Sequence, residues 1–151
     1  MGRPCQTNPI NAMNSTNSFR LFPVGLVLKT ESDVRIRIYP EYAGAMPGLE
    51  QFSHILALWW FHENDNARER GTLRVHPRGD KKNPLTGVFA TRSPARPNLI
   101  AVTPCRIERI EEADIIVDDI DAFHHTPVID VKPYFPLRDP DAVIRTPEWA
   151  K

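Results

Sequence analysis

The sequence predicts an all-β fold, a small barrel or sandwich, and three observations support this class. Short apolar or alternating runs recur along the chain and are separated by clusters of turn residues, as in proteins built from many short strands. The chain has 15 prolines in 151 residues, and proline interrupts helices because it lacks a backbone N–H. The sequence contains neither a long amphipathic helix pattern nor an internal repeat, so only short helical turns are expected.

The first two strands are expected near the start of the barrel segment. Residues 22–29 form an apolar run, and residues 34–39 alternate strictly between apolar and charged or aromatic side chains. Because successive side chains of a strand point to opposite faces, the apolar ones of 34–39 should share one face. Arg35 and Arg37 then share the other face. We expect them to be solvated, and contact with RNA is the alternative.

The third expected strand covers residues 53–61, which are apolar on both faces and include Trp59 and Trp60. Such a run fits a strand that is covered on both sides. One cover is the barrel interior. The other is either the core of the same monomer or a second subunit, because Trp is enriched at the cores of interfaces. The loop 40–48 before it leads into a helical turn near 46–51.

Four further strands are expected after residue 71. They cover residues 72–76, 100–110, 113–117 and 127–131. Pro104 lies inside the second of them and implies a bulge or an edge position, because proline cannot donate to a ladder.

The length indicates one domain, which we place at residues 19–137, between a flexible leader at 1–18 and a tail at 138–151. Lys plus Arg and Asp plus Glu both number 19, so any RNA contact must come from local patches. Two cysteines are too few for a disulfide framework, and the histidines do not fall at metal-ligand spacing. Without a signal peptide or a long apolar run, the cytoplasm is the expected compartment.

The segment 87–98 is expected to begin as an apolar strand-like run and to turn into a stiff, exposed ledge. Pro94 and Pro97 fix their own φ and push the preceding residues toward extended geometry. The ledge carries Arg92 and Arg96, whose planar guanidinium groups suit carboxylate or phosphate. The alternative is a turn whose arginines pair with carboxylates of the same surface.

Three segments together carry a family resemblance. They are 48–54 (GLEQFSH), 87–98 (GVFATRSPARPN) and 126–134 (TPVIDVKPY), and the resemblance spans 24–136. The chain resembles the TsaA/YaeB-like family of tRNA threonylcarbamoyladenosine methyltransferases, which use S-adenosylmethionine. The resemblance implies a small closed β-barrel, a homodimer with the cofactor near the interface, and a tRNA anticodon loop as substrate.

The resemblance also implies the site residues. Arg92 is expected to bind the cofactor's carboxylate, and Asp121 or Glu63 is expected to bind its ribose. Phe123 is expected to stack on the cofactor. The residues that align with the family's cofactor segments are His62, Glu63, Arg92, Val102, Asp121, Ala122, Phe123 and His124.

Methyl transfer to a weakly nucleophilic nitrogen profits from a general base or a strong acceptor. Asp130, Lys132 and Tyr134 of the third segment are the catalytic candidates, although Asp130 could only cap a turn and Lys132 could only pair with it. RNA contacts are expected from Lys81, Lys82, Arg92 and Arg96, with Lys81 and Lys82 otherwise a solvated turn.

The chain departs from the family pattern at two points that bear on the site. His124-His125 stands where relatives carry Asp-Gly, and we expect these two side chains to diverge as in a strand. A Pro-Arg-Gln cluster that relatives carry between their first two strands is missing. Two alternative functions follow: a cofactor-binding barrel with a different acceptor, or a non-catalytic ligand-binding module.

Overall fold

The structure is a computed structural model and describes residues 18–136 and 145–150. The predicted leader, apart from Ser18, and most of the predicted tail lie outside the described residues. Within the described residues no helix is long and apolar enough to cross a membrane.

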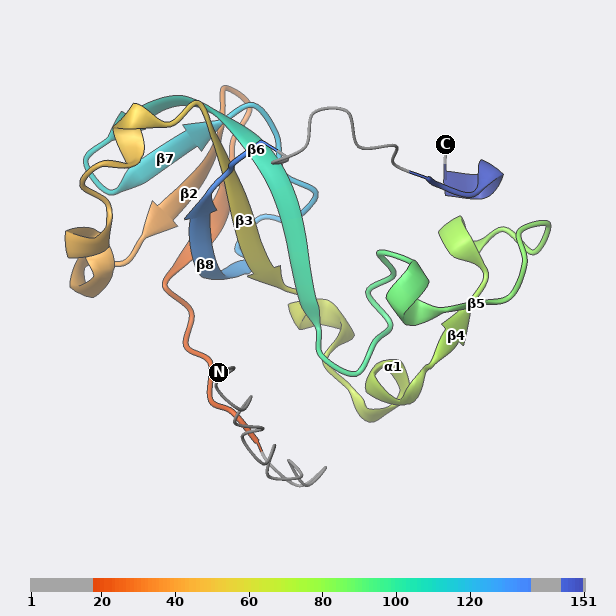
Figure 1. Cartoon of the computed structure of the whole chain (residues 1–151). Coiled ribbons are helices and arrows are strands. Elements are labelled where there is room, and N and C mark those ends of the chain that lie inside the picture. Colours follow the sequence, from red (N-terminus) through yellow and green to blue (C-terminus); the bar gives the residue numbers. More distant parts are fainter. Residues whose placement is uncertain (1–17, 137–144, 151) are drawn as a thin grey trace, which may run out of the picture.

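Six strands form a closed barrel in the order β1-β2-β7-β6-β3-β8 (Figure 1). All neighbouring strands pair antiparallel. This confirms the predicted all-β fold and the closed barrel. The strands are β1 (Gly25–Lys29), β2 (Val34–Ile38), β3 (His54–Trp60), β6 (Ile100–Glu111), β7 (Asp114–Val117) and β8 (Pro127–Pro133).

The strand alternation places the core inside the ring. On β2, Ile36 and Ile38 are buried whereas Arg37 is exposed, as the period of two predicts. On β3 the buried residues are Ile55, Ala57 and Trp59, and the residues between them are half-buried. The second face of β3 is therefore apolar and only partly covered.

Pro104 is accommodated in the way that the sequence predicts. The first half of β6, including Pro104, pairs with β3, while β7 pairs only with Ile107 and the residues after it. The other side of β6 at Pro104 is therefore an edge. The register also shifts between Ile107 and Arg109, so a bulge follows it.

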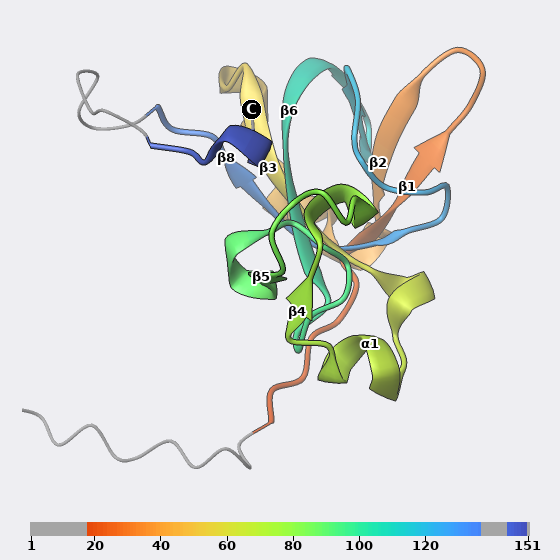
Figure 2. The ribbon, with the colours of Figure 1, turned by 90° about the vertical axis from the view of Figure 1, so that its right-hand side faces the viewer.

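Between β3 and β6 the chain leaves the barrel and forms what we call the arm, residues 62–99. Figures 1 and 2 show the arm projecting from one end of the barrel. Its only sheet is the pair β4–β5. The arm consists of η3 (His62–Asn64), α1 (Ala67–Gly71), β4 (Arg74–Val75), η4 (Pro77–Gly79), β5 (Thr86–Gly87), η5 (Val88–Ala90) and the ledge that follows.

The first part of the segment 87–98 is not a strand-like run, so that expectation is wrong. Residues Val88–Ala90 form a 3₁₀ turn in which the Thr91 amide donates to the Val88 carbonyl at 3.1 Å. The Arg96 guanidinium closes the turn by donating to the carbonyls of Val88 at 2.8 Å and Thr91 at 3.1 Å. A contact eight residues away thus overrides the local apolar pattern.

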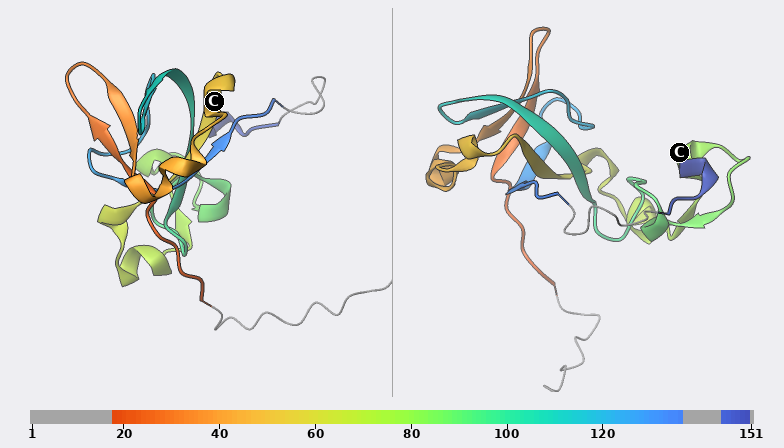
Figure 3. Two further views of the ribbon diagram at one scale, coloured as in Figure 1. Left: turned by 90° about the vertical axis from the view of Figure 1, so that its left-hand side faces the viewer. Right: turned by 45° about the horizontal axis from the view of Figure 1, so that its top comes forward.

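Short helical turns also occur outside the arm. The turns η1 (Pro40–Ala45) and η2 (Leu49–Gln51) lie on the side of the barrel away from the arm, as Figures 1 and 3 show. A last turn, η6, covers Glu148–Ala150.

Candidate functional site

A cavity of about 380 Å³ lies where the arm joins the barrel. Four segments that are distant in sequence form its wall: the end of β1, the end of β3 with η3, the ledge, and the β7–β8 loop. The residues that line it are Lys29, Trp59, Trp60, Phe61, His62, Glu63, Asn64, Arg92, Pro94, Asp121, Ala122, Phe123 and Thr126.

Most of the predicted cofactor residues meet at this cavity. They come from three separate parts of the chain, and the barrel topology brings them together because β3 and β8 are neighbours. Six of the eight line it: His62, Glu63, Arg92, Asp121, Ala122 and Phe123.

Val102 and His124 do not line this cavity. Val102 lies on the outer face of β6, pairs with Leu58 and is 43% exposed. His124 is turned toward β1, where its Nδ1 accepts a hydrogen bond from the Lys29 amide at 3.0 Å. Neither residue is therefore positioned against a ligand in this cavity.

The rings of His124 and His125 contact each other in a tilted arrangement with centroids 3.8 Å apart, so the expectation that they diverge is wrong. That expectation assumes a strand, but the pair lies in the turn before β8. His125 adopts a left-handed conformation with φ of 65°, the region where glycine is most at ease. The turn therefore keeps the backbone that the relatives' Asp-Gly would favour, with a histidine in place of the glycine.

The cavity has a buried floor and a charged, exposed rim. Trp59, Ala122 and Thr126 are buried, whereas Glu63, Arg92 and Asp121 are exposed. Trp59 is fixed by its Nε1, which donates to the Thr103 hydroxyl at 3.0 Å, and by an edge contact to Phe61 at 4.8 Å between centroids. An apolar floor with separated cations and carboxylates at its rim suits a ligand that is both aromatic and zwitterionic.

Seven of the lining residues are not among the predicted cofactor residues, and the sequence held a signal for two of them, Lys29 and Thr126. Lys29 ends the first strand, and its Nζ donates to the Ile120 carbonyl at 2.7 Å while lying 3.8 Å from an Asp119 oxygen. Thr126 opens the segment 126–134 that carries the family resemblance. Only the pairing of β1 with β8 shows that these two residues border one cavity.

The wall beside the cavity is held by an ionic cluster. Arg70 donates from Nε to Asp65 at 2.7 Å and lies over the Trp60 ring, 5.4 Å from its centroid. The Trp60 Nε1 donates to the other oxygen of Asp65 at 3.1 Å. The hydrogen bond from Arg70, followed by that from Trp60, lowers the pKa of Asp65 below its ordinary value. The carboxylate therefore stays charged and keeps the indole in place.

Of the catalytic candidates, Asp130 and Lys132 lie at alternate positions of β8 and share one face of the strand, and Tyr134 comes directly after its last residue. The Lys132 Nζ lies 2.6 Å from an Asp130 oxygen, as the alternative interpretation of this pair expects. Asp130 borders a different cavity of about 470 Å³, next to η1 and η2. Along a strand, Asp130 is roughly 13 Å and Tyr134 roughly 26 Å from Thr126. The three candidates therefore lie progressively farther from the arm-side cavity of the same chain.

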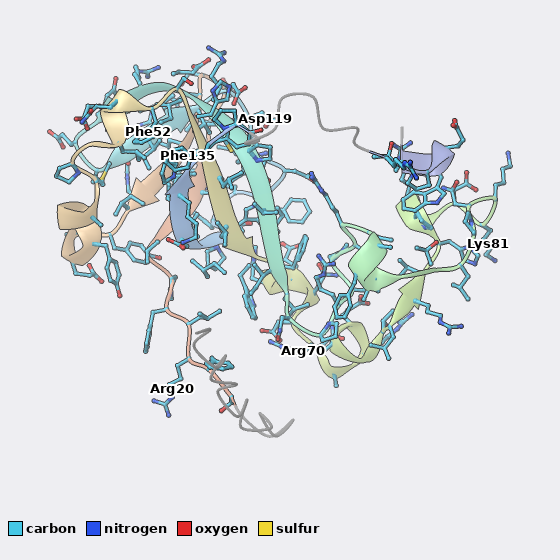
Figure 4. The ribbon with its side chains drawn as sticks, in the orientation of Figure 1. Arg20, Phe52, Arg70, Lys81, Asp119 and Phe135 are labelled. Atoms are coloured by element: carbon cyan, nitrogen blue, oxygen red, sulfur yellow. The ribbon has the colours of Figure 1, made fainter. Side chains whose placement is uncertain are left out.

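The residues expected to contact RNA are distributed over the arm. Lys81 and Lys82 are exposed, and Figure 4 shows Lys81 at the far tip of the arm. Arg92 is exposed at the rim of the cavity. Arg96 is half-buried and braces the ledge through the carbonyls of Val88 and Thr91. The ledge thus presents one outward guanidinium group at the cavity, not two.

The residues of the arm-side cavity fit S-adenosylmethionine by their chemistry. Arg92 and Lys29 are cations for a carboxylate, and Glu63 and Asp121 are acceptors for ribose hydroxyls. The aromatic wall of Trp59, Phe61 and Phe123 suits an adenine ring and a sulfonium cation.

Comparison with known proteins agrees with this geometry. A family model described as the tRNA-methyltransferase O N-terminal domain matches residues 16–140. A "probable S-adenosyl-L-methionine-binding protein" of Methanocaldococcus jannaschii is 45% identical over 114 residues, 76% of this chain and 90% of that protein. The human tRNA (adenine(37)-N6)-methyltransferase is 41% identical over 101 residues, 67% of this chain and 22% of that protein.

A solved structure has the same fold. The crystal structure of TrmO from Pseudomonas aeruginosa matches with a TM-score of 0.68 and 26% identity, over 89% of this chain and 63% of that chain. The chain therefore spans less than two thirds of the TrmO chain and about a fifth of the human enzyme, but most of the Methanocaldococcus protein.

Proposed function

Because the chain belongs to the tRNA-methyltransferase O N-terminal domain family, we propose that it transfers the methyl group of S-adenosylmethionine to an adenosine of tRNA. The proposed acceptor atom is N6 of adenosine 37, after the name of the human relative. A threonylcarbamoyl-modified adenosine is the finer form of this proposal. The cytoplasm is the proposed compartment, since the substrate is a tRNA.

The observation that carries the proposal is the cavity at the base of the arm. The cavity has an apolar floor, and its rim is formed by Arg92, Glu63 and Asp121. Glu63 and Asp121 are nearly 60 residues apart in the sequence. This set supports recognition of an adenosyl group linked to an amino acid. A non-catalytic ligand-binding module would have the same cavity, so the assay below must include transfer as well as binding.

The side chains of the cavity have distinct roles in the proposed reaction. When bound, the cofactor supplies a methyl group on a sulfonium, which the acceptor nitrogen displaces in line. Arg92 orients the ligand by its carboxylate, and Glu63 or Asp121 accepts from the ribose. Trp59 and Phe61 exclude water from the reacting end, which limits hydrolysis and strengthens the polar contacts.

A second subunit is part of the proposal, because the catalytic candidates on β8 and directly after it lie far from the cavity of their own chain. We propose a homodimer in which Asp130, Lys132 and Tyr134 of one protomer face the cavity of its partner. There, Asp130 would accept the proton of the N6 nitrogen, and Lys132 and Tyr134 would hold Asp130 and the acceptor in position. The half-covered outer face of β3 and the exposed Val102 and Tyr134 support such a contact.

The arm supports binding of the RNA. Lys81, Lys82 and Arg92 are exposed, with Lys81 at the tip of the arm and Arg92 at the rim of the cavity, so all three are available to phosphates of a bound RNA. Arg96 serves this surface by holding the ledge. The zero net charge of the chain makes this local arrangement, not a general field, the basis of RNA binding.

Calorimetric titration with S-adenosylmethionine tests the proposal on the wild type and on Arg92→Ala. We expect the wild type to bind and Arg92→Ala to bind about ten- to a hundredfold more weakly, because a hydrogen bond to a charged group contributes about 1.5–3 kcal/mol. Transfer is then measured with labelled cofactor and tRNA from cells lacking this activity, with mass spectrometry of the nucleosides.

Arg74→Ala is the matched control, since Arg74 is an exposed arginine on β4 that does not line the cavity. It should leave the affinity for the cofactor unchanged. If the protein binds the cofactor but transfers no methyl group to any tRNA, the acceptor is a molecule other than tRNA. If the wild type does not bind the cofactor, the methyltransferase proposal is wrong and the chain is a ligand-binding module.

A further inference from the structure

Thr126 has a side-chain hydroxyl that the fold itself leaves without a partner. The residue is 0% exposed, and within the described residues its Oγ1 makes no hydrogen bond. Its backbone is engaged on both sides: the amide donates to the Phe123 carbonyl at 3.2 Å, and the carbonyl accepts from the Val27 amide at 2.9 Å. Only the hydroxyl remains unsatisfied.

A buried hydroxyl without a partner weakens the folded state, because it has lost its bonds to water and gained none. Valine has nearly the same shape and would remove this penalty. Such a group in a folded protein is therefore explained by a hydrogen-bond partner that is not part of the isolated chain. Thr126 lines the cavity at the base of the arm, so a ligand in that cavity is a candidate partner for its hydroxyl.

The surroundings of Thr126 indicate which part of the ligand it meets. It is buried at the floor together with Trp59 and Ala122, whereas Arg92 and Asp121 are exposed at the rim. The adenine ring is the least polar part of S-adenosylmethionine, and its edge carries both donors and acceptors. An apolar floor with one hydroxyl, which can donate and accept, suits that ring.

We propose that the Thr126 hydroxyl hydrogen-bonds the edge of the adenine base and so selects the nucleobase of the methyl donor. This inference rests on the proposed function, since it assumes that the cavity takes the cofactor. It assigns the floor to the base and leaves the rim to the ribose and the amino acid. Thr126 is then a binding residue that reads the base, distinct in effect from Arg92.

Thr126→Val tests the inference because it keeps the shape and removes the hydroxyl. Titration is carried out with S-adenosylmethionine, S-adenosylhomocysteine and adenosine, alongside thermal unfolding of the ligand-free protein. We expect the affinity for all three ligands to fall about tenfold, because the base edge loses its partner. The ligand-free variant should unfold at the same temperature as the wild type or a higher one.

Three controls separate the possible outcomes. Thr86→Val makes the same change on β5, away from the cavity, and should bind as the wild type does. Arg92→Ala should lower the affinity for S-adenosylmethionine and S-adenosylhomocysteine but not for adenosine, which has no carboxylate. Thr126→Ser, which keeps the hydroxyl, should retain most of the affinity.

Wild-type affinity of Thr126→Val for all three ligands overturns the inference while leaving the proposed function intact. A wild type that binds none of the three overturns the proposed function and the inference with it. Where Thr126→Val does not fold, Thr126→Ala removes the same hydroxyl without adding volume. Undiminished adenosine binding by that variant also overturns the inference.

Discussion

At the scale of single residues, Asp114 is a carboxylate on the barrel that two arginines hold. Its carboxylate accepts from Arg35 Nη1 at 2.9 Å and from Arg37 Nε and Nη2, both at 2.8 Å. The residue is only 8% exposed, so solvent screens these contacts less than at an open surface. The hydrogen bonds from Arg37 and then Arg35 lower the pKa of Asp114, although burial opposes them.

Asp114→Asn is expected to destabilise the protein by about 1–2 kcal/mol at neutral pH, because two arginines lose a charged acceptor. The pKa of Asp114 is lower in the folded state than in the unfolded chain. Its contribution is therefore fully present above the unfolded pKa, near 4, and is lost as the pH falls through the folded value. Urea unfolding of both proteins between pH 7 and pH 2.5 measures this.

The gap in unfolding free energy between wild type and Asp114→Asn should close as the pH falls, since the wild-type carboxyl becomes neutral as well. Glu31→Gln, at an exposed turn, is the control and should show no comparable gap. A gap that stays constant down to pH 2.5 would contradict the ionic explanation and indicate a packing defect.

The strand alternation correctly predicts that Arg35 and Arg37 lie on the outer face of the barrel. It does not predict their partner, because Asp114 is 79 and 77 positions away and meets them only through the pairing of β2 with β7. The alternation alone therefore favours solvent for these arginines. The same limit explains why Lys29 and Thr126 escaped notice, since their neighbourhood is also created by strand pairing.

At the scale of elements, the β1–β2 hairpin depends on one residue that has no side chain. Gly25 pairs with Ile38, and a Cβ placed on it would lie 2.2 Å from the Arg37 carbonyl oxygen. That oxygen belongs to the neighbouring strand and cannot move without disturbing the ladder. The close approach lets β1 bridge β2 on one side and β8 on the other, where Gly25 pairs with Val128.

Gly25→Ala is therefore expected to destabilise the barrel by about 2–3 kcal/mol, the range for forced overpacking in a core. Gly87→Ala is the matched control, because a Cβ added there would meet no atom within 4 Å beyond its chain neighbours, and its φ is −61°. That change should alter the unfolding free energy by about 0.5 kcal/mol or less. Equal stability of the two variants, measured by thermal and urea unfolding, would refute the steric explanation.

The barrel strands could be predicted from the sequence because their residues alternate or are apolar throughout. The arm could be predicted less well. Its strands β4 and β5 have two residues each, and its turns are held by contacts such as that of Arg96 with the Val88 carbonyl. A period of two cannot be recognised in two residues, and a brace across eight positions leaves no periodic signal.

At the scale of the whole molecule, the two predicted groups of site residues occupy different places. The cofactor residues meet at the arm side of the barrel, whereas Asp130 borders the cavity beside η1 and η2. The resemblance in sequence ties both groups to one reaction without saying that they belong to one subunit. The distance along β8 between the arm-side cavity and Asp130 is the physical reason to consider a shared site. An isologous dimer can bring the strand of one protomer to the cavity of its partner.

A shared site makes a prediction that a site within one subunit does not. At a cofactor concentration near the Kd of the wild type, Arg92→Ala and Asp130→Ala should each be nearly inactive alone, one because it binds the cofactor weakly and one because it lacks a proton acceptor. Mixed in equal amounts and allowed to exchange subunits, they should regain about a quarter of the wild-type methyl transfer. Half of the dimers are then mixed, and each mixed dimer has one site with both residues intact.

The measurement needs the mass in solution as well as the activity. Light scattering should give twice the chain mass of 17.2 kDa for the wild type and for both variants, so that exchange of subunits is possible. Mixing Arg92→Ala with an Arg92→Ala/Asp130→Ala double variant is the control and should restore nothing, because no intact Arg92 is present. If the two single variants are dimers, exchange subunits and still regain no activity, then Asp130 either acts beside its own cavity or has no part in the transfer.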